Sequence, residues 1–351
     1  MRKKILNYSI LGLVFLLPLF FLPLMADFYA MPKNFLLIFT AVTAFCLWFA
    51  DKLISRKFKF SSSPFDLPVL LFCVVNIVST LIASPNKMES LLMPGGTGTI
   101  IALTLLYFVI KNNVKSITQL LNYLITSASL LALLSFYQFL GIGEEIAPFE
   151  WMKPKFWTPT GSLLALTVFL VVGLVIAVMK FKEKSGVKQQ ELSSGQSTEL
   201  SSNELKKPPS GTARFFSLTA IVVLLLGIAT ALYQLFTTQK LVMLPYSTGW
   251  AIAVEGFKNL KTGLFGVGPA NFISAFTRFR PIAFNNTEVW NARFTYSSNL
   301  YLQLLTEVGL LGLLSFLFIV YKVLTRHATR DTRHAMPYTL SYCSILFCLQ
   351  I

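Results

Sequence analysis

Charged residues and histidines are scarce in this chain, and their scarcity excludes several classes of protein. Only 13% of the 351 residues are charged, whereas 54% are hydrophobic. An ordinary soluble domain carries about 25% charged residues, so the composition excludes that class. The two histidines, His327 and His334, lie in one short basic segment, which severely limits any histidine-based mechanism.

Cysteines are also few, and all four fall in apolar stretches: Cys46, Cys73, Cys343 and Cys348. A disulfide or a thiolate metal site needs paired and accessible sulfurs, so we interpret these cysteines as packing residues. The cysteines therefore predict no thiolate metal site, and we expect no cofactor.

Long apolar runs are the main feature of the sequence. Many approach about 20 residues, the length that a helix needs to cross a hydrocarbon core of about 30 Å. We predict an all-α polytopic membrane bundle with nine spans, at 5–26, 32–50, 64–83, 97–110, 117–140, 161–180, 215–236, 300–321 and from 337 onward. Pro18 and Pro23 are expected to kink the first span. The ninth is still running at Ile351, so we expect the chain to be part of a longer protein.

The distribution of lysine and arginine predicts the orientation of these spans. We predict that the spans cross the plasma (inner) membrane and that the N-terminus is cytoplasmic. In this orientation 20 of the 30 basic residues lie on the inside, as the positive-inside rule requires. The net charge of +15 is then explained by basic segments that face anionic membrane lipids, and no nucleic-acid partner is expected.

Composition divides the chain into three parts. Residues 1–182 form an N-terminal bundle of six spans. Residues 183–214 are rich in Ser, Gln, Glu and Lys and have few apolar residues, which predicts a disordered cytoplasmic linker. Residues 215–351 form a C-terminal transmembrane part with one large extracytoplasmic loop, 237–298. Six basic residues lie in that loop although the positive-inside rule disfavours them there.

The large loop contains two recognisable patterns. Trp250, Ala251, Val254 and Phe257 recur at helical spacing, which predicts an amphipathic helix lying either on the membrane or on the bundle. The glycines of the following stretch, 263–268, permit tight turns and close backbone approach. A dinucleotide-binding loop fits poorly, because the glycines have no strand–turn–helix context and no cytosolic nucleotide is present on that side of the membrane.

A polar stripe leads from the loop into the span that follows it. Asn299, Gln303 and Glu307 are spaced four residues apart, so they share one helix face. Gly309 and Gly312 lie deeper and allow a neighbouring helix to approach. Placing Glu307 inside a membrane costs free energy unless its side chain faces a cavity or a partner. Its role is either functional or that of a structural partner of a loop cation.

Three arginines of the loop, Arg278, Arg280 and Arg293, suit a diphosphate ligand. Guanidinium groups bind phosphate oxygens in a bidentate manner and stay charged at any relevant pH. A polyprenyl-diphosphate sugar donor would present such a group, and its departing diphosphate needs charge stabilisation. Binding of lipid headgroups is the alternative.

These patterns together resemble the O-antigen ligase family of membrane glycosyltransferases. The matching elements are Trp250 with Ala251, the turn 263–272 (GLFGVGPANF), and Ser298-Asn299 followed nine residues later by Gly309-Leu-Leu-Gly312. The resemblance covers about 75 residues and implies a GT-C-like fold. It also implies transfer of a glycan from undecaprenyl diphosphate to a lipid or protein acceptor on the outer face of the membrane, without metal or nucleotide.

The resemblance also implies roles for individual residues. Arg278, Arg280 and Arg293 are expected to bind the diphosphate, with Trp250 in the substrate-binding segment, and Asn299, Gln303 and Glu307 are expected to line the acceptor side. Arg293, Glu307 and Ser298 are the candidate catalytic residues. Ser298 stands where the family carries its catalytic histidine, and Tyr246 stands where many members have an arginine. A neutral serine is a poor general base, so Glu307, Glu288 or Glu255 would have to act as base.

Two further functions compete with a ligase. An O-antigen or polysaccharide polymerase uses the same donor and a second lipid-linked glycan as acceptor, and the sequence does not separate the two. A non-catalytic glycolipid-binding protein of an export complex, or a transporter, is favoured by the missing histidine. The retained arginine and polar stripe favour a transferase.

Overall fold

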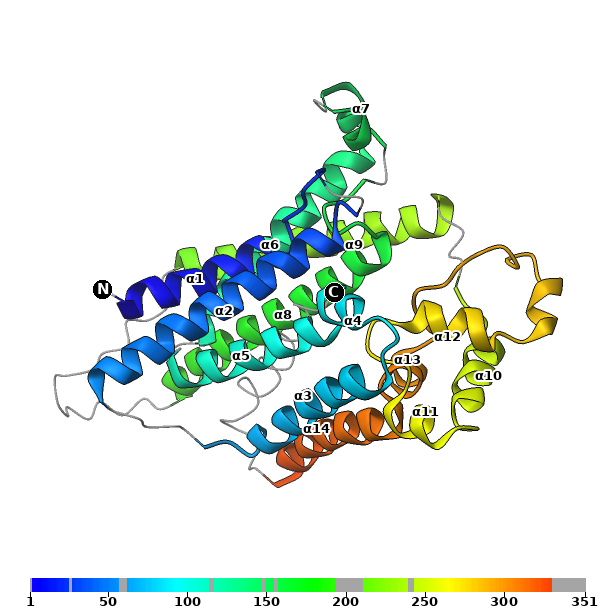
Figure 1. Ribbon diagram of the computed structural model, residues 1–351. Helices are drawn as coiled ribbons and strands as arrows, with labels where there is room; N and C mark the ends of the chain where they lie inside the picture. The colour runs from blue at the N-terminus through cyan, green and yellow to red at the C-terminus, as the bar shows by residue number, and fades with distance from the viewer. Residues whose placement is uncertain are drawn as a thin grey trace. The chain divides into compact units, whose positions relative to one another are not determined.

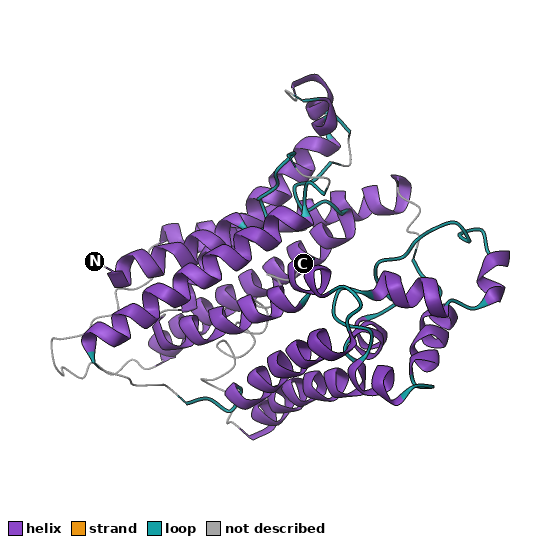
Figure 2. Ribbon diagram, in the orientation of Figure 1, coloured by secondary structure: helices purple, strands orange, loops and turns teal. Residues whose placement is uncertain are grey.

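The computed structural model describes residues 2–24, 27–56, 62–113, 117–146, 149–154, 157–193, 211–238 and 243–329. Within these ranges every regular element is a helix and no strand occurs (Figure 2). The prediction of an all-α fold is therefore confirmed for this part of the chain. The described residues fall into two compact units, one within 1–13, 22–115 and 241–339 and the other within 14–21, 116–240 and 340–351. Helix α1 (Arg2–Leu16) is divided between them.

The first unit joins an early and a late part of the sequence. Its long helices are α2 (Ala30–Ser55), α3 (Asp66–Ala83), α5 (Thr97–Asn113) and α14 (Gly309–Thr329). Helices α2 and α5 pack together, and α3 packs on both α5 and α14 (Figure 1). An ion pair joins α3 to α5, since Lys111 Nζ lies 2.6 Å from Asp66 Oδ2 and Tyr107 donates to Asp66 Oδ1 at 2.9 Å. The two charges at this end of α3 and α5 thereby compensate each other.

The second unit is built from α6 (Ile117–Phe139), α8 (Leu163–Ser193) and α9 (Gly211–Thr238), which contact one another pairwise. The short elements α7 (Ile142–Ile146) and η1 (Glu150–Met152) connect α6 to α8. Small residues allow the close approach of the helices: a Cβ added at Gly173 would lie 2.8 Å from Ala128 Cβ, and one at Gly227 would lie 2.4 Å from Ala132 Cβ. Such small-residue contacts are typical of helices that pack in lipid.

Six helical stretches are long and apolar enough to cross a membrane. They are α2, α3, α4 (Lys87–Leu92) together with α5 over Lys87–Asn113, α6, the part Leu163–Lys182 of α8 and the part Phe216–Thr237 of α9. They coincide with six of the nine predicted spans. A helix satisfies its own backbone hydrogen bonds, which is why apolar runs of this length adopt it in lipid. These six helices indicate a membrane protein.

The other predicted segments differ from the structure. Helix α1 ends at Leu16, so Pro18 follows the first helix and does not kink it. The predicted span 300–321 is broken into α13 (Leu300–Glu307) and α14, because Gly309 adopts φ +75°, which ends a right-handed helix. Both ends of the predicted linker are helical. Residues 183–193 continue α8, since Glu, Gln and Lys favour helix even without an apolar face, and residues 211–214 begin α9. Its centre, 194–210, and the ninth span lie outside the described residues.

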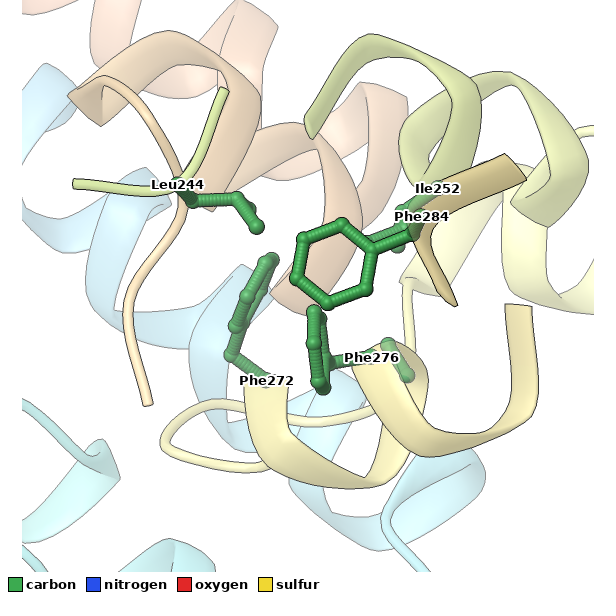
Figure 3. Close-up of a cluster of buried hydrophobic side chains, with 6 residues drawn as sticks. Leu244, Ile252, Phe272, Phe276 and Phe284 are labelled. Carbon is green, nitrogen blue, oxygen red and sulfur yellow. The ribbon is translucent and has the colours of Figure 1, made fainter. Parts of the chain in front are cut away.

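Residues 243–299 form short helices around a core of their own. The helices are α10 (Tyr246–Gly256), α11 (Leu260–Phe265), α12 (Phe272–Phe279) and the 3-10 helix η2 (Ile282–Asn286). The rings of Phe272, Phe276 and Phe284 meet between Leu244 and Ile252 (Figure 3), and all five side chains are buried. The ring centroids of Phe276 and Phe284 lie 5.5 Å apart in an edge-to-face arrangement. Aromatic burial of this kind is sufficient to order a segment that lacks long helices.

Candidate functional site

Two of the three segments on which the resemblance rests pack against each other. The turn 263–272 wraps around the C-terminal end of α13, where Val267 N donates to Thr306 O at 3.0 Å and Gly268 N donates to Glu307 O at 2.8 Å. The last carbonyl groups of a helix lack partners within it, and here the turn supplies them. Residues about 40 positions apart in the sequence thus form one compact centre of the first unit.

The glycines of both segments are explained by this contact. A Cβ on Gly266, which has φ +71°, would lie 2.2 Å from Glu307 O. A Cβ on Gly309, which has φ +75°, would lie 2.4 Å from Leu264 O. No side chain fits between backbones at such distances, and both φ values lie in the region that favours glycine. The glycine spacing therefore reflects contact between two stretches of backbone.

Glu307 lies at the centre of this contact, at the end of α13 and outside the six candidate spans. Its side chain is only 7% exposed. Oε1 accepts from Gln303 Nε2 at 2.6 Å and from Phe272 N at 3.3 Å, where α12 begins. Burial raises the pKa of Glu307 to about 8, and the hydrogen bonds from the Ala270 and Phe272 backbone and from Gln303 partly oppose that rise. The enclosed, largely neutral carboxyl group favours a structural role, joining α13 to α12.

The other two residues of the predicted polar stripe, and Ser298 directly before it, also form hydrogen bonds within the fold. Gln303 Oε1 accepts from Ser297 N, so Gln303 bridges the preceding segment and Glu307. Asn299 is the N-cap of α13, and its Oδ1 accepts from Leu302 N at 2.7 Å. Ser298 is half-buried and its Oγ donates to Pro245 O at 3.1 Å. The stripe therefore fixes the start and the end of α13.

The three arginines are exposed and lie beside the aromatic core. The Arg280 guanidinium lies 5.9 Å from the ring centroids of Phe276 and Phe284, and its Nη1 donates to Trp290 O at 3.2 Å. Arg293 precedes Phe294, whose ring lies 5.8 Å from that of Phe276.

Arg278 lies in α12 with its guanidinium 5.2 Å from the Phe279 ring centroid. In the described part of the chain, no carboxylate forms a salt bridge with any of the three arginines. Their charges are therefore available to an anionic ligand.

Trp250 lies apart from the polar stripe. It belongs to α10, whose buried face consists of Thr248, Gly249, Ile252 and Ala253, whereas Trp250 itself is 60% exposed. Its neighbour Gly249 lies against Ser298, since a Cβ there would lie 2.5 Å from Ser298 Oγ. The two segments of the resemblance therefore meet through Gly249, and the Trp250 side chain is exposed.

Sequence reasoning missed four polar residues that complete this centre. Asn271 Nδ2 donates to Ser84 Oγ at 3.0 Å and to Ser90 Oγ, and Ser90 Oγ donates to Pro269 O at 2.8 Å. Ser79 Oγ donates to Phe265 O at 2.5 Å. The available signal was the recurrence of serine near the end of an apolar span, where polar residues are uncommon unless they have a partner.

The site offers exposed guanidinium groups for an anion and buried hydrogen bonds that hold their scaffold together. Over the described ranges, no cluster of His, Cys, Asp and Glu has the composition of a metal site. No protein-family model and no curated protein sequence matches the chain.

Proposed function

We propose that this chain is a membrane glycosyltransferase of the O-antigen ligase type. It transfers a glycan from undecaprenyl diphosphate to a lipid or protein acceptor outside the plasma membrane, with a GT-C-like fold and a cytoplasmic N-terminus. The observation that carries the proposal is the packing of the turn 263–272 on the end of α13. Two segments chosen by resemblance alone have a physical reason to occur together, and the arginines lie on the segment between them.

The arginines supply the chemistry that such a donor requires. Arg278, Arg280 and Arg293 bind the diphosphate and stabilise the negative charge that develops on it as the glycosidic bond breaks. Their exposure and the lack of carboxylate partners in the described residues support this role. The stacking of Arg280 on phenylalanine rings orients its guanidinium group before the donor arrives.

Ser298 and Glu307 activate the acceptor, and Glu307 can do so only in its deprotonated form. Only deprotonated Glu307 is a base, and its pKa of about 8 keeps most of it protonated at neutral pH. Transfer that depends on Glu307 as base therefore rises as the pH increases through about 8. In the structure Gln303 and the α12 backbone enclose that carboxyl group, so its acceptor role requires opening of this contact.

The test is transfer from a labelled undecaprenyl-diphosphate oligosaccharide to a mixed acceptor pool in proteoliposomes. Arg293→Ala is expected to abolish transfer and Arg293→Lys to weaken it, because lysine keeps the charge without the bidentate geometry. Lys87→Ala, which removes an exposed cation of α4 (Lys87–Leu92), is the matched control and is expected to retain activity. Equal transfer by Arg293→Ala and wild type would contradict the proposal. A ladder of products would identify a polymerase.

A non-catalytic glycolipid-binding function, as in an export complex, is the second candidate. One observation favours it: Ser298 donates its hydrogen to a backbone carbonyl and Glu307 is buried, so neither is presented as a base. Arg293-dependent binding of the labelled donor without any glycan transfer would establish this function.

A further inference from the structure

Helices α10 and α11 carry a stripe of exposed apolar side chains. Tyr246, Trp250, Val254 and Phe257 are spaced by three or four residues, so they share one side of α10, and all are exposed. Leu260, at the start of α11, extends the stripe and is 77% exposed. The predicted amphipathic helix is therefore present, and its Trp250 face is not the face that packs on the protein.

The depth of this stripe follows from the contacts of α11. Helix α3 has 18 residues and is about 27 Å long at 1.5 Å per residue, so it needs its full length to cross a hydrocarbon core of about 30 Å. Ser79 Oγ, in the last turns of α3, donates a hydrogen bond to the carbonyl oxygen of Phe265, the last residue of α11. The C-terminal end of α11 therefore lies about one helical turn inside the end of α3, near the level where α3 leaves the apolar layer.

The direction of α10 and the nearby charges fit the same surface. Figure 1 shows α10 lying across the line of α3 and α14, the direction expected of a helix in the plane of a bilayer. Lys258 and Lys261 are exposed next to the stripe, and Lys258 also pairs with Glu255 at 2.7 Å. Apolar side chains with a tryptophan, flanked by lysines, match an apolar boundary beneath anionic headgroups.

We infer that the stripe formed by Tyr246, Trp250, Val254, Phe257 and Leu260 docks on the surface of the phospholipid bilayer that the long helices cross. Docking holds α10 in the membrane plane and fixes the distance between the membrane and the arginine-bearing segment. This inference concerns an interaction surface, and it stands whether or not the protein transfers a glycan.

The test uses tryptophan emission of the full chain in vesicles whose phospholipids carry bromine on their acyl chains near the headgroup. Subtracting the emission of Trp250→Phe from that of wild type gives the emission of Trp250. The same subtraction with Trp290→Phe gives the emission of Trp290, the matched control. Trp290 is exposed in the same segment but lies outside the stripe. Bromolipid is expected to quench most of the Trp250 emission and to leave the Trp290 emission at its value in unbrominated lipid.

Aqueous acrylamide distinguishes the remaining outcomes. If acrylamide quenches Trp250 and bromolipid does not, Trp250 faces solvent. If neither quencher reduces its emission, Trp250 is covered by another protein surface or by a second copy of the chain. Either result overturns the inference. A nitroxide on Leu260→Cys, compared with one on Asn285→Cys in a background without the native cysteines, provides a second measurement. It should show greater collision with lipid-soluble oxygen at Leu260→Cys, and the inference fails if the two positions are equal.

Discussion

Glycine serves two different purposes in the two units of this protein. In the second unit, Gly173 and Gly227 lie in the middle of long helices, and the atoms nearest to an added Cβ belong to Ala128 and Ala132. In the first unit, Gly266 and Gly309 lie at helix ends, have positive φ, and face backbone carbonyl groups. The same residue type therefore marks helix-on-helix packing in one unit and backbone-on-backbone contact in the other.

The difference shows where each unit tolerates change. A helix pair that meets through small side chains can shift slightly or exchange the small residue between partners. A turn whose amide groups bind the carbonyl groups of Thr306 and Glu307 has no such freedom, because a displacement leaves buried backbone groups without partners. We therefore expect the centre around Glu307 to be the more sensitive region.

The largest effect is expected from Gly266→Ala. The new methyl group would lie 2.2 Å from Glu307 O, and alanine is also strained at φ +71°. We expect the free energy of unfolding to fall by more than about 4 kcal/mol, so that little folded protein accumulates. Yield of monodisperse protein in detergent and thermal unfolding followed by circular dichroism measure the effect.

Gly95→Ala separates the two causes. Gly95 has φ +76°, but an added Cβ has no atom within 4 Å. Gly95→Ala should lower the free energy of unfolding only by the strain of an alanine in the left-handed conformation, about 1–2 kcal/mol. If Gly266→Ala is no worse than Gly95→Ala, the close approach of the two backbones is not the reason for the glycine.

A smaller effect is expected from Gly173→Ala in the second unit. The added methyl group would lie 2.8 Å from Ala128 Cβ, and the next nearest atoms are at 3.8 Å. Overpacking of this kind costs up to about 3 kcal/mol. The double variant Gly173→Ala with Ala128→Gly exchanges the methyl group between partners and should recover most of the loss in unfolding temperature. Failure to recover would show that this contact is not an exchangeable small-residue pair.

The six long helices could be predicted from sequence because bilayer thickness fixes the length and polarity of a span. The break after Glu307 could not, because an apolar run containing Gly309 also fits a continuous helix with a packing glycine. Only the fold shows that Gly309 has φ +75° and faces Leu264 O.

The candidate site was predicted in part for a related reason. Four-residue spacing correctly placed Gln303 beside Glu307, since spacing reports neighbours on one helix. It did not reveal that Glu307 accepts from Phe272 N, because that contact joins backbone and side chain across 35 residues. The periodicity of α10 identified the apolar side that carries Trp250 and missed the side with Ile252 and Ala253, which is the buried one.

Glu307 offers a pH-dependent test of the same contact, with an intermediate effect. Its pKa rises from 4.5 in the unfolded chain to about 8 in the fold, so the folded state binds the proton more tightly. The resulting stabilisation is fully present below about pH 4.5 and is lost as the pH rises through about 8. We expect wild type to lose about 3 kcal/mol between about pH 6 and about pH 9, measured by thermal unfolding.

Glu307→Gln should remove this pH dependence, because an amide does not titrate and can keep the hydrogen bond from Phe272 N. Glu288→Gln is the matched control, since Glu288 is exposed in the same segment, and its variant should follow the wild-type profile. A wild-type unfolding temperature that does not change over this pH range would mean that Glu307 is already ionised in the fold.

The smallest effect is expected from Asn299, where structural and substrate-binding roles can be separated. Asn299→Ala removes the N-cap of α13, in which Oδ1 accepts from Leu302 N at 2.7 Å, and should cost about 1 kcal/mol of unfolding free energy. Asn299→Asp keeps an oxygen for that amide and should unfold like wild type. If Asn299 also lines the acceptor, Asn299→Asp retains stability but loses glycan transfer, because a carboxylate replaces the neutral amide. Retained transfer by Asn299→Asp, with both properties reduced in Asn299→Ala, would restrict Asn299 to capping the helix.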